Sequence, residues 1–146
     1  MDLVKRLLDE KGNAIYSISP STTVWDAAGA MAGHHIGAIL VIAEKSLQGI
    51  FSERDLLVRV LLAGRDPKTT PVSDVMSKDL VYVTPQASVG EAMAVMTERR
   101  CRHLPVLDEG ELVGLVSIGD CTRAASRDQD YTIRHLTEYI HNRYPG

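Results

Sequence analysis

Two short stretches of the chain place a serine three residues before an aspartate: Ser52 with Asp55, and Ser117 with Asp120. Each follows an apolar run, so we expect each aspartate in the first turn of a helix that leaves a buried strand. There the carboxylate can accept two hydrogen bonds from a cis-diol such as that of a ribose, while the serine hydroxyl and the N–H groups of the helix start favour a phosphate. The alternative is that both aspartates only cap their helices.

The two stretches occupy equivalent positions of an internal repeat. A shift of 65 positions aligns residues 15–57 with residues 80–122 without a gap, and it pairs Gly49 with Gly114 as well as both serines and both aspartates. A repeat of this length predicts two copies of one unit that pack against each other, with two clefts related by a pseudo-twofold axis. Because the Ser-x-x-Asp pattern recurs in both copies, we favour ligand binding over capping alone.

The elements that position these residues are predicted in the same order in both copies. An extended segment, residues 14–18 or 80–83, leads into a helix that Ser21 or Thr22 caps in the first copy and Ser88 caps in the second. Apolar residues then recur at helical spacing and form the core face of each helix. These residues are Val24, Ala27, Ala28 and Met31, and Val89, Ala92, Met93 and Met96.

A hairpin and a second helix complete each copy. Their predicted bounds, copy by copy, are 38–42, 47–51 and 55–63, and then 103–107, 112–116 and 120–125. Gly49 and Gly114 lie in the second strand of each hairpin, where they let another part of the chain approach closely. The second helix of the second copy is predicted to be the shorter and more polar of the two.

Segments outside the repeat complete the predicted organisation. A shift of 68 positions sets the apolar residues of 4–8 on those of 72–76, so an amphipathic turn or helix precedes each copy. Residues 132–143 carry an apolar stripe that predicts a helix covering its own core or a partner chain. The predicted divisions are 1–63 for the N-terminal helix and first copy, 64–79 for the linker and lead-in turn, 80–126 for the second copy, and 127–146 for a C-terminal helical tail.

Composition narrows the class of protein. The chain has 146 residues, and the 45% of them that are hydrophobic are enough to build a core. Its formal net charge is -3, and it has no block of basic residues that would bind nucleic acid or anionic lipid. We find neither a signal-like start nor an apolar run approaching the roughly 20 residues of a membrane span, so we expect a cytoplasmic protein without nucleic-acid or membrane partners. Cys101 and Cys121 lack companion thiols, which favours reduced thiols over a disulfide or a structural zinc site.

Other patterns suggest catalysis, but each lacks a necessary part. His34 and His35 are adjacent, so a helix would point them about 100° apart rather than toward one metal. Cys101 and His103 share a strand face and could form a thiolate–imidazole pair, yet the sequence offers no oxyanion hole or orienting group. A Walker loop and a GxGxxG sequence are absent. We therefore expect no catalytic residue and no metal, with an unrecognised hydrolase as an alternative.

The order strand, helix, strand, strand, helix, with Gly-x-x-Ser-x-x-Asp at residues 49–55 and again at 114–120, resembles the cystathionine-β-synthase (CBS) domain. Over residues 1–126, including the linker motif at 72–77, the chain resembles a stand-alone tandem pair, or Bateman module. The resemblance implies an α/β (α+β) fold of two pseudo-twofold-related β-α-β-β-α units packed through their sheets. It also implies adenosine-containing ligands in clefts between the halves, and a disk-shaped homodimer.

The resemblance assigns residues to a main cleft, which combines the Ser-x-x-Asp end of one copy with strand residues of the other. Asp120 would bind a ribose, and Ser117 would line the ribose or phosphate. Arg102 would contact a phosphate, with a solvated surface arginine as its alternative, and Gly119 would let the ligand approach. The predicted adenine wall is Ala14, Ile15, Tyr16, Ile36, Gly37 and Ala38.

The second implied cleft is built around Asp55. There Gly37 stands where the main cleft has an arginine, and Arg54 stands where it has a glycine, so Arg54 either holds a second phosphate or fills the space. The predicted residues of this cleft are Asp55, Ser52 and Arg54, with Val81, Cys101, Arg102 and His103 from the second copy.

Together these features predict a non-catalytic regulatory module that binds AMP, ADP or ATP and reports energy or redox state through the geometry of a dimer. NADH and S-adenosylmethionine are further candidate ligands. The expected partners are a second copy of the chain and an effector protein that the sequence does not identify. The alternative is a structural dimerisation or protein-interaction module with empty clefts. The physiological nucleotide, the number of occupied clefts and the direction of the dimer stay open at this stage.

Overall fold

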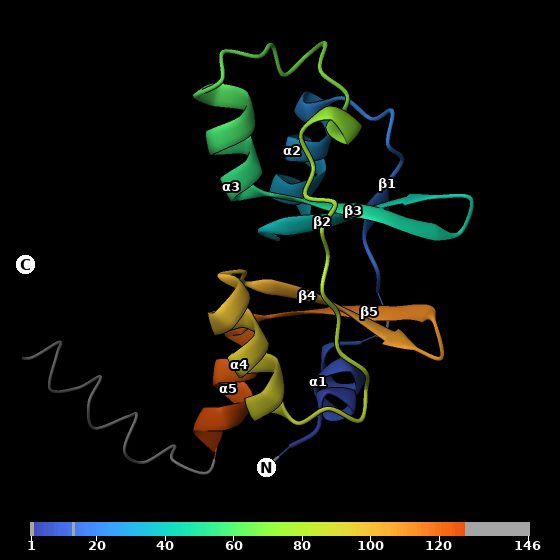
Figure 1. The fold of residues 1–146 in the computed structure, drawn as a ribbon, viewed down its shortest axis with the longest axis vertical. Coiled ribbons are helices and arrows are strands. Elements are labelled where there is room, and N and C mark those ends of the chain that lie inside the picture. Colours follow the sequence, from blue (N-terminus) through green and yellow to red (C-terminus); the bar gives the residue numbers. More distant parts are fainter. Residues whose placement is uncertain (1, 13, 128–146) are drawn as a thin grey trace, which may run out of the picture. The chain divides into compact units, whose positions relative to one another are not determined.

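The computed structural model describes residues 2–12 and 14–127, and it confirms the predicted mixture of helices and small sheets (Figure 1). The chain divides into two compact units. Residues 14–81 form the first unit, and residues 2–12 form the second unit together with residues 82–127. Each unit therefore holds one copy of the internal repeat.

The first unit is a three-stranded sheet that carries its helices on one face (Figure 1). Its elements are β1 (Ser17–Ile18), α2 (Val24–His34), β2 (Ala38–Ala43), β3 (Ser46–Ser52), α3 (Glu53–Asp55), the π-helical segment η1 (Leu56–Leu61) and the 3-10 turn η2 (Val72–Asp74). β2 is central, parallel to β1 and antiparallel to β3. Its core includes the predicted face of α2, with Val24, Ala27 and Met31 packed in one cluster with Phe51.

The second unit repeats this arrangement around a two-stranded sheet, again with its helices on one face (Figure 1). Its elements are α1 (Val4–Lys11), α4 (Val89–Arg99), β4 (His103–Asp108), β5 (Glu111–Ser117) and α5 (Ile118–Ser126). β4 and β5 are antiparallel. Val89, Ala92 and Met96 of α4 are buried, as their helical spacing predicts.

The two hairpins are equivalent residue by residue. Val41 pairs with Gly49 and Val106 with Gly114, and each hairpin has its bulge directly after that pair. The leading segments match as well, because Val83 forms a parallel bridge to Val106 just as Ile18 pairs with Val41. The 65-residue shift read from the sequence is thus the structural repeat.

The first helix of each copy begins and ends at equivalent residues. Ser88 caps α4 by accepting a hydrogen bond from the Glu91 N–H at 3.0 Å, which confirms the predicted cap. In the first copy the prediction of Ser21 or Thr22 is wrong. Thr23 caps α2, and it is the residue that lies 65 positions before Ser88.

The lead-in segments pack across the repeat. α1 precedes the first copy but joins the second unit, where the Val4 N–H donates to the Ala87 carbonyl at 2.8 Å. The segment around η2 precedes the second copy but joins the first unit, where the Val72 N–H donates to the Thr22 carbonyl at 2.8 Å. The compact units therefore differ from the division at residues 63 and 79 that sequence order suggested, because each lead-in segment is bonded to the other copy's helix start.

Both predicted close approaches at glycine are present. A Cβ added to Gly114 would lie 2.6 Å from Leu8 Cδ2, and one added to Gly49 would lie 2.7 Å from both Met76 Sδ and the Ser77 carbonyl oxygen. Leu8 and Met76 are the residues that the 68-position shift aligns. The side chain of each lead-in segment thus rests on the bare backbone of a strand.

The predicted element lengths need three corrections. Only Ser17–Ile18 of the extended segment 14–18 is a strand, and only Val83 of 80–83 forms a bridge. The helix predicted at 55–63 starts at Glu53 and continues as η1, and α5 is longer than predicted because its capping residue is Ser117. The predicted tail helix lies outside the described residues. Among the residues described, no helix combines the length and the apolar content needed to cross a bilayer.

Candidate functional site at the Ser-x-x-Asp helix starts

Asp120 is held in the first turn of α5 by a reciprocal pair of hydrogen bonds. The Asp120 N–H donates to Ser117 Oγ at 3.1 Å, and the Ser117 N–H donates to Asp120 Oδ2 at 2.9 Å. This capping box satisfies two backbone donors at the helix start and fixes the carboxylate, which is only 9% exposed. The capping alternative considered for the sequence is therefore correct as geometry, and it leaves the carboxylate oxygens available to further donors.

Two cations complete the surroundings of this carboxylate. Lys11 Nζ, from the end of α1, lies 2.8 Å from Asp120 Oδ2 and also donates to the Leu115 carbonyl at 2.8 Å. Arg123 Nη2, one turn along α5, lies 2.5 Å from Asp120 Oδ1. Burial alone would raise the pKa of Asp120, but the hydrogen bonds from Lys11 and Ser117, with the charge of Lys11, outweigh it and lower the pKa.

The equivalent Asp55 has the same capping box and different outer partners. Its N–H donates to Ser52 Oγ at 3.2 Å, and the Ser52 N–H donates to Asp55 Oδ2 at 3.0 Å. The hydroxyl of Ser77 donates to Oδ1 at 3.1 Å, and Arg59 Nε lies 3.7 Å away from the same oxygen. A neutral hydroxyl thus stands where Asp120 has an ammonium group.

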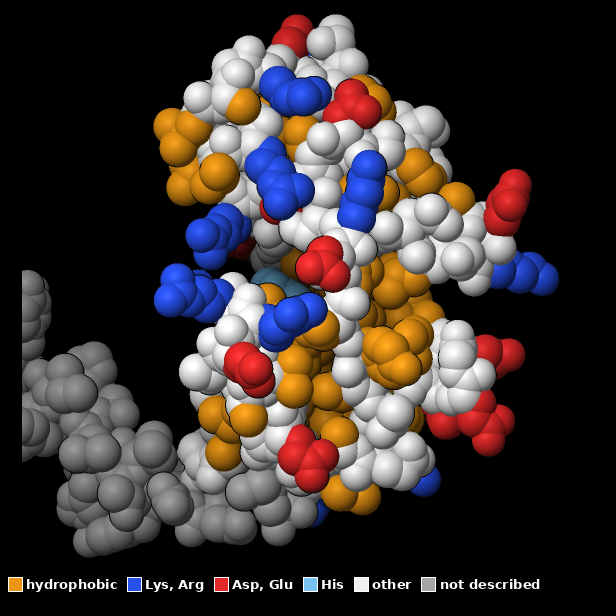
Figure 2. Space-filling view, viewed as in Figure 1, with side chains coloured by type: hydrophobic (Ala, Val, Ile, Leu, Met, Phe, Trp, Pro, Cys, Tyr) orange, Lys and Arg blue, Asp and Glu red, His pale blue; other side chains and the backbone are white. Residues whose placement is uncertain are grey.

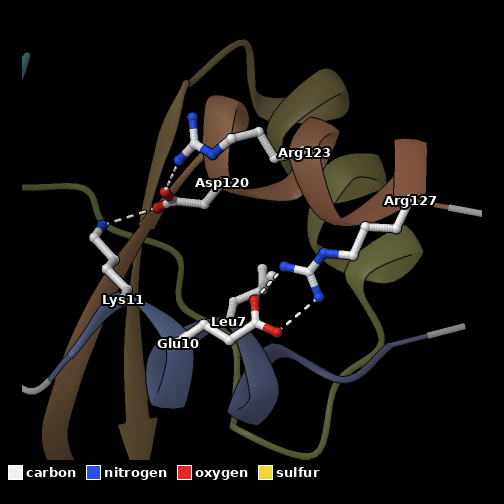
Figure 3. Close-up of a pocket in the computed structure, with 6 residues that line it drawn as sticks. All are labelled: Leu7, Glu10, Lys11, Asp120, Arg123 and Arg127. Atoms are coloured by element: carbon white, nitrogen blue, oxygen red, sulfur yellow. Dashed lines mark hydrogen bonds and ion pairs between the residues drawn. The ribbon is translucent and has the colours of Figure 1, made fainter. Parts of the chain in front are cut away.

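A pocket of about 360 Å³ opens beside Asp120, between α1 and α5 of the second unit (Figure 3). Its lining residues are Leu7, Glu10, Lys11, Asp120, Arg123 and Arg127. In Figure 3, Lys11 and Arg123 both point to Asp120, while Arg127 forms a forked ion pair with Glu10. That pairing lowers the pKa of the Glu10 carboxyl. The pocket therefore combines three cations with two carboxylates.

The strand entrance lies at the helix start in both units. The Ile118 N–H donates to the Arg102 carbonyl at 2.8 Å, and the Glu53 N–H donates to the Gly37 carbonyl at 3.0 Å. The Arg102 backbone is therefore next to the capping box that contains Asp120, its side chain is exposed, and its contact with a phosphate stays a prediction. Gly119 leaves room beside Asp120, where an added Cβ would lie 3.4 Å from Arg123 Nη1 and 3.6 Å from Ser117 Oγ.

The predicted adenine-wall residues all belong to the first unit. Ala38 pairs with Ser52, and Tyr16 precedes β1 and accepts a hydrogen bond from the Leu40 N–H at 3.4 Å. The Tyr16 ring is exposed and stacks on His34 at a centroid distance of 3.9 Å. Contacts from the wall (Ala14, Ile15, Tyr16, Ile36, Gly37 and Ala38) to Asp120 stay a prediction, as do those from Val81, Cys101, Arg102 and His103 to Asp55.

The groups considered for catalysis have other surroundings. Burial raises the pKa of both Cys101 and Cys121, which favours the protonated thiol over a nucleophilic thiolate. His35 closes α2 in the left-handed conformation, with φ 55. Within residues 2–12 and 14–127, no group of three His, Cys, Asp or Glu side chains is placed to hold a metal ion.

Sequence reasoning missed the residues that contact the carboxylates from outside the capping boxes. These are Lys11 and Arg123 at Asp120, and Ser77 and Arg59 at Asp55. The 68-position shift sets Lys11 on Asp79 and Ser77 on Asp9. The repeat therefore carried no signal for either contact, although it did align the segments that provide them.

Comparison with known families decides the class of this protein. A family model described as CBS domain matches the chain twice, at residues 12–62 and 72–127. The chain belongs to the CBS domain family. CBS domains are generally regulatory modules. Both copies here carry an aspartate in the capping box at the start of their second helix.

Relatives of this CBS domain pair are found among curated proteins and solved structures. The CBS domain-containing protein CBSX3, mitochondrial, of Arabidopsis thaliana is 39% identical over 127 residues, which span 84% of this chain and 62% of that protein. A putative signal-transduction protein with CBS domains from Burkholderia ambifaria superposes with a TM-score of 0.81 at 42% identity, over 86% of this chain and 93% of that one. The CBS domain pair of protein MJ0100, solved with 5-methylthioadenosine and S-adenosyl-L-methionine, shares the fold with a TM-score of 0.74 at 20% identity, over 86% and 97% of the two chains.

Proposed function

We propose that this CBS domain pair is a non-catalytic regulatory module that binds an adenosine nucleotide at its Ser-x-x-Asp helix starts. The Ser117–Asp120 start is the principal site and the Ser52–Asp55 start is the second. AMP, ADP and ATP are the proposed ligands, with NADH as a further candidate. The adenine-wall residues that the family resemblance assigns remain part of this proposal.

The observation that carries the proposal is a buried carboxylate fixed at the start of a helix, twice, at positions 65 residues apart. Capping fixes Asp120 through Oδ2, so Oδ1 is bound only by the exposed Arg123 side chain among the contacts described. A carboxylate held in this way is pre-organised to accept ribose hydroxyls. The N–H groups of the same helix start favour a nearby phosphate.

The MJ0100 complex supports the class of ligand. That protein binds two adenosine compounds on a CBS domain pair, so the fold can accept an adenosine group. At 20% identity the likeness does not carry the chemistry of the remainder of the ligand to this chain. We therefore infer the adenosine group of the ligand from the family, and its phosphate from the two cations that contact Asp120.

Regulation requires that ligand binding favour one arrangement of the module over another. We propose a homodimer as the element that responds. The helical segment after Asp55 offers a surface for it, because Leu57, Val58, Leu61 and Leu62 are between 48% and 72% exposed. Figure 2 shows apolar side chains gathered over the position of α3.

Calorimetric titration with AMP, ADP, ATP, NADH and S-adenosylmethionine tests the proposal. We expect micromolar binding of a nucleotide to the native chain, loss of that binding in Asp120→Ala, and its retention in Asp55→Ala. Ser88→Ala is the matched control, because it removes a helix cap from the same unit without touching Asp120. Absence of binding by all five compounds would exclude an adenosine sensor.

The alternative function is a dimerisation or protein-interaction module that binds no nucleotide. The exposed apolar residues of η1 favour it, since they suit a protein surface and not a nucleotide. Light scattering with and without AMP distinguishes the two functions. A stable dimer whose mass and dissociation constant are the same with and without AMP would support the interaction module.

A further inference from the structure

Both oxygens of Asp120 are already hydrogen-bonded within the chain. Oδ2 accepts from the Ser117 N–H and from Lys11, and Oδ1 accepts from Arg123. A carboxylate offers about four acceptor positions in all, so only about one remains. The two hydroxyls of a ribose therefore cannot both bind Asp120 until a cation moves away.

The cations are able to move, but each needs a new anion. The Lys11 side chain is 41% exposed and that of Arg123 is 71% exposed, whereas the carboxylate that they share is nearly buried. The pocket offers Lys11 no free carboxylate, because Glu10 is engaged by Arg127. Three cations and two carboxylates line the pocket, so one further negative charge would balance it.

We propose that Lys11 and Arg123 form a phosphate subsite beside Asp120, which makes this site selective for adenosine phosphates over uncharged nucleosides and over sulfonium compounds. The inference rests on the proposed function. Ligand entry exchanges partners: the ribose hydroxyls bind Asp120, and the displaced ammonium and guanidinium groups bind the phosphate. Every charged group then keeps an opposite partner. A nucleoside would break the bond between Lys11 and Asp120 and leave Lys11 only the Leu115 carbonyl. S-adenosylmethionine would add net positive charge, because its sulfonium and ammonium groups outnumber its one carboxylate.

The Asp55 site lacks this device. Its nearest outer donor is the neutral hydroxyl of Ser77, and Arg59 is held by the carbonyls of Val75 and Met76 at 3.3 and 3.0 Å. A diol can displace a hydroxyl without leaving a cation unpaired. We therefore expect selectivity for phosphate to be confined to the second unit.

Titration of Lys11→Met with adenosine, AMP and ATP tests the subsite. Methionine keeps the apolar stem of the lysine and removes its charge. Lys5→Met is the matched control, because it removes the same charge from the same helix at an exposed position outside this pocket. We expect AMP and ATP affinity to fall about tenfold or more in Lys11→Met relative to Lys5→Met, with adenosine affinity unchanged or increased, since a charge-assisted hydrogen bond is lost only with phosphate. Lys11→Arg keeps the positive charge, so it should retain most of the AMP and ATP affinity that Lys11→Met loses.

The other outcomes separate this inference from the function on which it rests. If the native chain binds adenosine and AMP equally, or if Lys11→Met weakens both equally, the phosphate subsite is excluded and the adenosine site stands. If the native chain binds none of the three, the proposed function fails and the subsite fails with it. Should Lys11→Met not fold, Arg123→Met applies the same test through a largely exposed side chain, and equal affinity of Arg123→Met and Lys5→Met for AMP would overturn the proposal.

Discussion

The two Ser-x-x-Asp sites have one backbone and two different electrostatic settings. Both carboxylates are fixed by a capping box at the start of a helix, at equivalent residues of equivalent hairpins. Asp120 is then neutralised by Lys11 and Arg123, whereas Asp55 receives the hydroxyl of Ser77 and a longer ion pair from Arg59. The repeat therefore determines where the carboxylate lies, while one residue of each lead-in segment and one arginine of each following helix determine what surrounds it. Two copies of one motif can in this way differ in ligand.

The largest difference should appear when each carboxylate is removed. Asp120→Ala deletes a capping bond and two charge-assisted bonds, and we expect it to lower the free energy of unfolding by about 2–3 kcal/mol. Asp55→Ala deletes a capping bond, the bonds from the Ser77 hydroxyl and a 3.7 Å ion pair with the exposed Arg59, which adds little, and we expect about 1 kcal/mol. Urea unfolding of both variants measures this. Equal losses would mean that the cations contribute nothing to the second unit.

The Asp120 contribution should also depend on pH. Because the folded chain lowers the pKa of Asp120 below its ordinary value of 3.8, its ionisation stabilises the fold above that pH, and the contribution is lost as the pH falls through the lowered value. The deficit of Asp120→Ala seen at neutral pH should therefore shrink once the pH drops below 3.8. Thermal unfolding of the native chain and the variant across this range checks the sign, and a deficit that grows in acid would contradict it.

The two glycine contacts should differ in their tolerance of a methyl group. In Gly49→Ala the new Cβ meets the Ser77 carbonyl oxygen at 2.7 Å, which is backbone, and we expect a loss of about 1–2 kcal/mol. In Gly114→Ala it meets only the flexible side chain of Leu8, with Cδ2 at 2.6 Å, and we expect less than about 1 kcal/mol. Denaturant midpoints rank the two variants. As a control, Leu8→Ala should relieve the strain of Gly114→Ala when the two are combined.

The two arginines beside the carboxylates should differ in how salt changes their contribution to stability. Arg59 donates to two carbonyls and pairs with Asp55 only at 3.7 Å, so Arg59→Met should cost about 1 kcal/mol and lose little of that cost in high salt. Arg123 is 71% exposed and bonds a carboxylate, so Arg123→Met should cost about 0.5 kcal/mol in low salt and nothing measurable at about 1 M salt. Unfolding in both salt conditions tests this difference. If the cost of Arg123→Met does not depend on salt, the Arg123–Asp120 ion pair is less accessible to solvent than the exposure of Arg123 indicates.

Much of each unit was predictable because the repeat supplied two independent copies of every signal. The hairpin strands, the core faces of α2 and α4 and the close approaches at Gly49 and Gly114 follow from apolar spacing and from glycine within a strand. The positions of Asp55 and Asp120 at helix starts follow from the serines before them. The cap of α2 could have been predicted in the same way, because the 65-position shift aligns Thr23 with Ser88, the cap of α4.

The remaining features depend on contacts between distant parts of the chain. Lys11 reaches Asp120 across 109 positions, and neither its spacing nor its neighbours in the sequence mark it as a partner. Ser77 and Asp55 are 22 positions apart and belong to segments that the repeat alignment treats differently. Local propensity predicted both segments, but the exchange of lead-in segments between copies is a property of the tertiary fold and has no local signal.

The exchange of lead-in segments also sets an order of assembly during synthesis. The first unit is one continuous stretch, so all of it is available for folding before residues 82–127 have been made. α1 is made before the first unit, yet its packing partners β5 and α5 are made after that unit. The contact between Lys11 and Asp120 closes one of the longest loops in the chain and therefore forms late. A chain that stops before α5 can complete its first unit but cannot assemble the Asp120 site.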